Sequence, residues 1–142
     1  MFKKILVAVD GSSDSERAVA AAAELAKAHG SELHVCHVFH IPEHYRTDLG
    51  EPLRAAIGKD AEDILAHAVR TAERQGVKPT PHLIREGHPA EAIVRLAQEL
   101  KIGLIVVGVR GRTPDQMRAM GSVSDAVLHA AKCSVLVVRR HA

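Results

Sequence analysis

Five short strand-like runs, separated by helix-like stretches, constrain the fold of this chain more than any other feature of its sequence. They cover residues 5–9, 33–39, 78–85, 104–109 and 135–138. Short apolar runs bounded by turn residues are typical of strands that are buried on both faces. Their alternation with helices predicts one α/β domain over residues 1–142, an open five-stranded parallel sheet with helices on both faces.

Four helices are expected between these strands, over about 13–29, 52–75, 89–99 and 122–130. Ser13 and Glu16 form a capping box that opens the first helix. Gly30 and Gly76 are well placed to end the first two helices, because glycine adopts the left-handed conformation of a helix terminus at little cost. The third strand is expected at an edge of the sheet, since the prolines at 79 and 81 cannot donate to a ladder.

Composition and charge exclude several classes of partner. The chain has no Trp, one Tyr and two Phe, so its core must consist mainly of Val, Ile, Leu and Ala. A net charge of +2, without a basic run, argues against nucleic acid. The apolar runs are far shorter than the ~20 residues of a membrane span, and no signal peptide is evident at the N-terminus. We therefore expect a cytoplasmic protein whose two cysteines, Cys36 and Cys133, are reduced and mostly buried.

Two strand ends carry the residues that predict a ligand site, because ligands of open parallel sheets bind beyond the carboxyl ends of the strands. The first strand ends at Val9-Asp10-Gly11-Ser12. The fourth ends at Gly108-Val109-Arg110-Gly111, and nine residues later follows Gly121-Ser122-Val123-Ser124. Gly108, Gly111 and Gly121 would let the backbone approach a ligand closely.

The helix that follows Gly121 suits a phosphate. The amides of Ser122, Val123 and Ser124 would be unsatisfied donors at its N-terminus, where the helix dipole also favours an anion. The two serine hydroxyls would add donors, and Arg110 in the preceding loop could neutralise charge. Neither GxxxxGK[ST] nor GxGxxG is present, so a P-loop ATPase and an NAD enzyme are both disfavoured.

The pattern Gly-x2-Gly-x9-Gly-Ser, formed by Gly108, Gly111, Gly121 and Ser122, resembles the nucleotide motif of the ATP-binding universal stress proteins. The similarity extends over the whole chain, from the opening strand to the closing Ser134-Val135-Leu136-Val137-Val138. This resemblance implies the strand order 3-2-1-4-5. It also implies ATP as ligand, most simply bound together with Mg²⁺.

The resemblance further implies roles for single residues. Asp10 would bind the ribose hydroxyls, and Val38 would meet adenine through its backbone. A homodimer would form through the last strand, Val135 to Val138. The complete set of candidate cofactor-binding residues is Ala8, Val9, Asp10, Val38, Val107, Gly108, Arg110, Gly111, Gly121, Ser122, Val123 and Ser124.

No residue of the sequence is evidently arranged for catalysis or for a protein-bound metal ion. The leading hypothesis is a nucleotide-responsive regulatory module with an unknown protein partner. A slow ATPase or adenylyl-transferring enzyme is an alternative, although the first strand end lacks the paired glycines of an SGGxDS-like loop. A nucleotide-free scaffold is a third possibility. The ten histidines show no zinc-binding spacing, and we expect them to be surface or hydrogen-bonded residues.

Overall fold

The computed structural model describes residues 2–39, 51–85, 87–110 and 120–139. Along the chain these form β1 (Lys4–Ala8), α1 (Ser13–His29), β2 (Glu32–Val38), α3 (Glu51–Arg74), β3 (Thr80–Ile84), α4 (Pro89–Leu100), β4 (Leu104–Gly108), α5 (Ser122–Ala130) and β5 (Ser134–Val138). All strand pairs are parallel, and the sheet order is β3-β2-β1-β4-β5. The predicted fold class and strand order are therefore confirmed.

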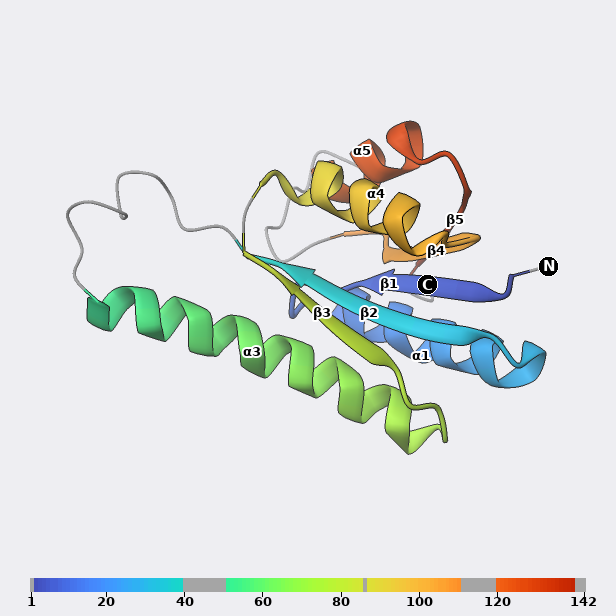
Figure 1. Cartoon of the computed structure of the whole chain (residues 1–142), viewed down its shortest axis with the longest axis horizontal. Coiled ribbons are helices and arrows are strands. Elements are labelled where there is room, and N and C mark those ends of the chain that lie inside the picture. The colour runs from blue at the N-terminus through green and yellow to red at the C-terminus, as the bar shows by residue number, and fades with distance from the viewer. Residues whose placement is uncertain (1, 40–50, 86, 111–119, 140–142) are drawn as a thin grey trace.

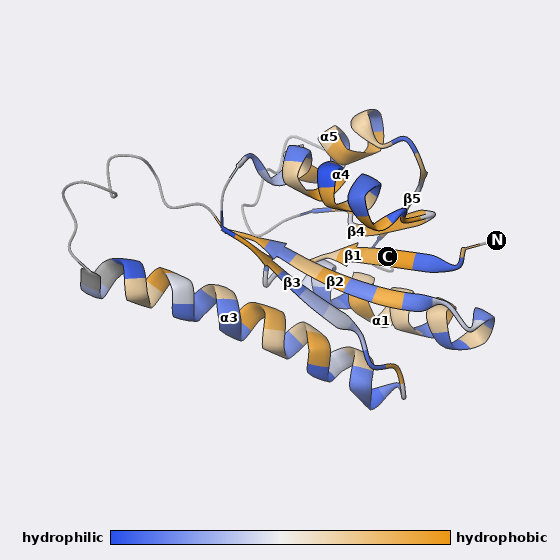
Figure 2. Ribbon diagram, in the orientation of Figure 1, coloured by the Kyte–Doolittle hydropathy of each residue, from blue (hydrophilic) through white to orange (hydrophobic). Residues whose placement is uncertain are grey.

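Helices cover both faces of the sheet, α1 and α3 on one side and α4 and α5 on the other (Figure 1). Successive residues of β1 serve the two layers in turn, because side chains alternate across a strand. Ile5 and Val7 pack with α1 and α3, whereas Leu6 packs with α4 and α5. Strands β1 and β4 are hydrophobic along most of their length, while α3 is mixed (Figure 2). This pattern is the one expected for central strands buried on both faces.

The start of α1 corrects one prediction. The capping residue is Ser12 rather than Ser13, and the Ser12 side chain accepts a hydrogen bond from the amide of Ser15 at 3.1 Å. Gly11 has a φ of 85° and so turns the chain before the cap, which leaves Ser12 extended and Ser13 as the first helical residue. The predicted end of this helix is confirmed, since Gly30 is in the left-handed conformation.

The two edges of the sheet are β3 and β5. Pro81 lies within β3, as predicted for an edge strand, and the strand is shorter than the 78–85 expected from sequence. The apolar residues 135–138 of β5 are half-buried on the opposite edge. None of the described helices combines the length and the hydrophobicity needed to span a membrane.

Candidate functional site

A hollow of about 200 Å³ lies beyond the carboxyl ends of β1 and β4, the two central strands that run on into different layers of helices. Eleven of the twelve candidate residues line it, and the twelfth, Gly111, lies outside the described residues. The eleven are Ala8, Val9, Asp10, Val38, Val107, Gly108, Arg110, Gly121, Ser122, Val123 and Ser124. Residues separated by about a hundred positions in sequence thus meet at the point where the strand order reverses.

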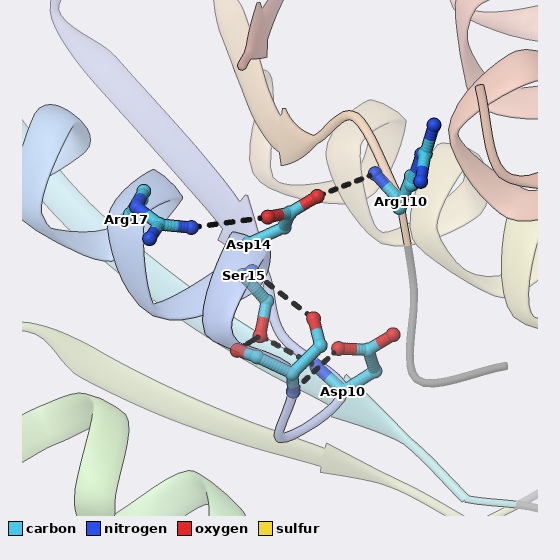
Figure 3. Close-up of polar contacts among 6 residues, drawn as sticks. Asp10, Asp14, Ser15, Arg17 and Arg110 are labelled. Carbon is cyan, nitrogen blue, oxygen red and sulfur yellow. Dashed lines mark hydrogen bonds and ion pairs between the residues drawn. The ribbon is translucent and has the colours of Figure 1, made fainter. Parts of the chain in front are cut away.

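Asp10 is held at the end of β1 by a network of short-range hydrogen bonds (Figure 3). Its Oδ1 accepts a hydrogen bond from the amide of Ser12 at 2.9 Å, and its own amide donates to Oγ of Ser15 at 3.3 Å. Oγ of Ser15 in turn donates to the carbonyl of Ser12 at 3.0 Å. These contacts hold the Asp10 backbone and carboxylate in place where they line the hollow.

Asp14 joins the first turn of α1 to the end of β4, a role that the sequence analysis missed. Its side chain is only 3% exposed. Oδ2 accepts a hydrogen bond from the amide of Arg110 at 3.1 Å, and Oδ1 accepts one from Nη1 of Arg17 at 3.2 Å. The Arg110 guanidinium itself points away from Asp14 (Figure 3). Asp14 therefore sets the path of the backbone as it leaves β4.

Gly108 has a packing role in addition to the ligand contact expected from the sequence. A Cβ atom at this position would lie 2.7 Å from the carbonyl carbon of Asp14 and 2.8 Å from its oxygen. Both are backbone atoms, which cannot rotate away. The absence of a side chain at Gly108 therefore allows α1 to approach β4, and this close packing in turn shapes the hollow.

The N-terminus of α5 opens onto the same hollow. Its cap, Gly121, has no side chain to satisfy the first helical amides, and its φ of −68° and ψ of 157° suit any residue. Ser122 is exposed. The buried hydroxyl of Ser124 instead donates to the carbonyl of Gly108 at 2.5 Å. This hydrogen bond joins α5 to β4, a structural role of the Ser124 hydroxyl that was not expected from the sequence.

The floor and the far wall of the hollow come from residues that the sequence analysis did not select: Ser15, Cys36, Pro89 and Ile93. Cys36 is completely buried, and burial raises the pKa of its thiol to about 12. It is therefore a small apolar wall residue rather than a nucleophile. His37 supports the site from the other face, since its Nδ1 donates to the carbonyl of Val9 at 2.7 Å.

Two further histidines, His34 and His82, form a pair that does not line this hollow. Nδ1 of His34 lies 2.9 Å from Nε2 of His82, and Nε2 of His34 lies 3.1 Å from Glu32. The ring centroids of the two histidines are 5.1 Å apart. Within the described part of the chain, no group of three or more His, Cys, Asp or Glu side chains is arranged to hold a metal ion.

Comparison with known proteins points to one family. A model of the universal stress protein family matches residues 1–139. A universal stress protein of Thermus aquaticus is 39% identical over 145 residues, covering 98% of this chain and 100% of the relative. Two solved structures overlie the fold. One is a universal stress protein in complex with cAMP, with a TM-score of 0.76, 29% identity, and coverage of 96% of this chain and 97% of the other. The other is the universal stress protein of Archaeoglobus fulgidus in complex with dAMP. It has a TM-score of 0.70 and 28% identity, and the match covers 96% of this chain and 98% of the other.

Proposed function

The chain belongs to the universal stress protein family, and from this premise we propose that the hollow beyond β1 and β4 binds ATP. The observation that carries the proposal is that Asp10, Gly108 and the N-terminus of α5 all line one hollow. The complexes of two relatives with cAMP and dAMP support an adenine nucleotide as the class of ligand.

The phosphates would lie against α5. The amides of Ser122, Val123 and Ser124 begin this helix behind a cap that carries no side chain. Unsatisfied amides and the positive end of the helix dipole favour an anion there. Arg110 lines the same hollow and would add a positive charge. Gly111, in the proposed phosphate loop, completes the motif in sequence.

The nucleoside would lie toward the other strand ends. The Asp10 carboxylate would accept hydrogen bonds from the ribose hydroxyls, for which an acceptor-only group is suited. Val38 would present its backbone to adenine, and Ile93 and Cys36, which line the same hollow, would offer apolar side chains to the base. A hollow of about 200 Å³ is smaller than the ~300–1,000 Å³ of pockets that enclose whole drug-sized ligands. It would therefore hold part of the nucleotide, and the rest would lie outside it.

Mg²⁺ would arrive with the nucleotide. Asp10 is the one carboxylate among the described lining residues. Such a lining fits Mg²⁺, which keeps several waters and is commonly held by phosphate oxygens with one or two carboxylates. It does not resemble a dedicated metal site built from protein ligands alone. The ion would supply positive charge between the phosphates, while the protein residues orient the nucleotide.

We propose a regulatory role, in which ATP occupancy changes how the chain meets a protein partner, rather than rapid turnover. The titratable side chains among the described lining residues are Asp10, Cys36 and Arg110. Cys36 is held protonated by burial, and Asp10 is assigned to the ribose. A homodimer through β5 belongs to the same proposal. Val135 to Val138 are half-buried on an edge strand, where a second copy would cover their apolar side chains.

Calorimetric titration with ATP in the presence of Mg²⁺ tests the proposal. Gly121→Val should abolish ATP binding and leave the circular dichroism spectrum unchanged, because the Gly121 backbone conformation is open to any residue. Ala66→Val, which introduces the same side chain at an exposed position of α3, is the control and should bind as the wild type does. Wild-type protein that binds no ATP at millimolar concentration would refute the proposal. Rapid hydrolysis that is lost in Asp10→Ala would favour an enzyme instead.

A further inference from the structure

A second hollow, of about 430 Å³, lies between the first half of α3 and the end of β3. Val38 and Phe39 show where this second hollow lies relative to the proposed nucleotide site. Val38 lines the first hollow, while Phe39, the next residue in the chain, lines the second. Since successive residues of an extended chain point to opposite faces, the two hollows open on opposite sides of the sheet. Their described lining residues do not overlap.

The second hollow has an excess of positive charge. Arg54 and Lys59 come from α3, and Arg85 follows β3, so two segments distant in sequence contribute. The acidic residue among the described lining is Glu62. Nε of Arg54 is buried, whereas Lys59 and Arg85 are exposed. Cationic groups gathered along one cleft raise the local concentration of anions.

The floor of this hollow is apolar. Phe39 is 9% exposed, and Leu83 and Ala55 line the same hollow. A free inorganic anion would meet the charges but would leave this floor in contact with water. A neutral apolar molecule would cover the floor, but it would displace water from the cationic groups and offer them no polar partner in return. The combination favours a ligand that carries both an apolar body and a negative charge.

Gly58 is the second observation that points to a ligand. It lies inside α3, where glycine is less favourable than any ordinary residue except proline. Neither its backbone nor its packing against the described residues requires glycine. Its φ is not positive, and apart from the backbone of α3 itself no heavy atom of the described residues lies within 4 Å of a Cβ built there. Gly58 lines the hollow. A side chain at this position would take space from a bound molecule.

We propose that this second hollow binds a small organic anion with an apolar or aromatic body. The body would lie on Phe39 and Leu83, beside the bare backbone of Gly58. Its carboxylate, sulfonate or phosphate would meet Arg85 and Lys59. The site is separate from the proposed nucleotide site, and its existence does not depend on ATP binding.

A fluorescent anion of this chemistry, 8-anilinonaphthalene-1-sulfonate, is a suitable probe for the folded chain. We expect saturable binding of one dye that persists with saturating Mg·ATP and in Gly121→Val. N-phenyl-1-naphthylamine, which has the same rings without the sulfonate, should bind much more weakly. Loss of the sulfonate dye on addition of ATP would place it in the first hollow and overturn the proposal. Equal binding of the neutral dye, or no binding of the anionic dye up to millimolar concentration, would overturn it too.

Two variants locate the dye. Arg85→Glu should weaken its binding about tenfold, because the change removes one favourable charge interaction and adds a repulsive one of similar size. Gly58→Met should weaken binding at least as much by filling the hollow, while methionine supports the helix. Arg70→Glu makes the same charge change at an exposed position of α3 outside the hollow and should leave the affinity within about twofold. Unchanged binding in both site variants, or equal weakening by Arg70→Glu, would contradict the assignment.

Discussion

Replacing Gly108 with alanine adds a single carbon atom at the point where α1 meets the end of β4. The new Cβ would lie 2.7 Å from the carbonyl carbon of Asp14, whereas ordinary van der Waals contacts begin at 3.4 Å. The difference, 3.4 minus 2.7, requires the two elements to separate by about 0.7 Å. Because the opposing atoms are backbone, a side-chain rotation cannot relieve the clash. Overpacking of this kind costs about 1–3 kcal/mol.

Urea unfolding measures this cost. With a slope of roughly 1–3 kcal/mol per molar urea, a loss of about 2 kcal/mol should lower the unfolding midpoint of Gly108→Ala by about 1 M. Separation of α1 from β4 should also lengthen the hydrogen bond from the Arg110 amide to Asp14, so ATP affinity should fall as well.

Gly58→Ala is the matched control, because the same atom is added where, among the described residues outside the backbone of α3, no heavy atom lies within 4 Å. It should stabilise the protein by up to about 1 kcal/mol, since alanine is the better helix former. The two substitutions should therefore shift the urea midpoint in opposite directions. If Gly108→Ala unfolds at the wild-type midpoint, the contact of α1 with β4 is not as close as described, and the argument for the shape of the hollow fails with it.

Three further predictions follow from buried polar groups. Asp14→Ala should lower stability by about 1–3 kcal/mol in thermal unfolding, because a loop amide loses its acceptor, and Asp14→Asn should recover part of the loss. Burial, and then the adjacent His34, lower the pKa of His82, so the native state binds fewer protons than the unfolded state. Stability should therefore fall as the pH drops from about 6.5 through the folded pKa. His82→Gln should reduce the loss of stability between pH 7 and 5. If the variant and the wild type lose stability equally over this range, the prediction is wrong. In native protein at pH 8, iodoacetamide should modify the half-buried Cys133 long before the buried Cys36, whose thiol has a pKa of about 12. Mass spectrometry measures the order of labelling, and early labelling of Cys36 would contradict the prediction.

Much of the architecture was accessible from the sequence, because its signals are local. Apolar runs bounded by turn residues marked the strands, and Pro81 correctly indicated an edge. The order of the strands, in contrast, came from the family resemblance. The cap of α1 was misplaced by one residue because Ser12 and Ser13 are both good caps, and the positive φ of Gly11 decides between them.

The candidate site was predictable where its residues belong to the glycine pattern and hidden where they depend on tertiary packing. Pro89 and Ile93 reach the hollow only because α4 lies across that face of the sheet. Asp14 had one local signal, its place in the first turn of a helix, but the Arg110 amide that it binds at the end of β4 is 96 residues away. Gly108 and Ser124 were both assigned to a ligand, although each also has a packing role, because their contacts with Asp14 and with each other form only in the folded chain.

The contact between Asp14 and Arg110 also bears on how the chain acquires its fold during synthesis. The two residues are 96 positions apart. At a translation rate of ~5–20 residues per second, the ribosome needs roughly 5–20 seconds to produce the second after the first. During that interval β1 can pair with β2, but its other edge, which β4 will occupy, has no partner within the chain. A nascent chain of this protein therefore exposes an apolar strand edge, open to chaperones, until its last third emerges.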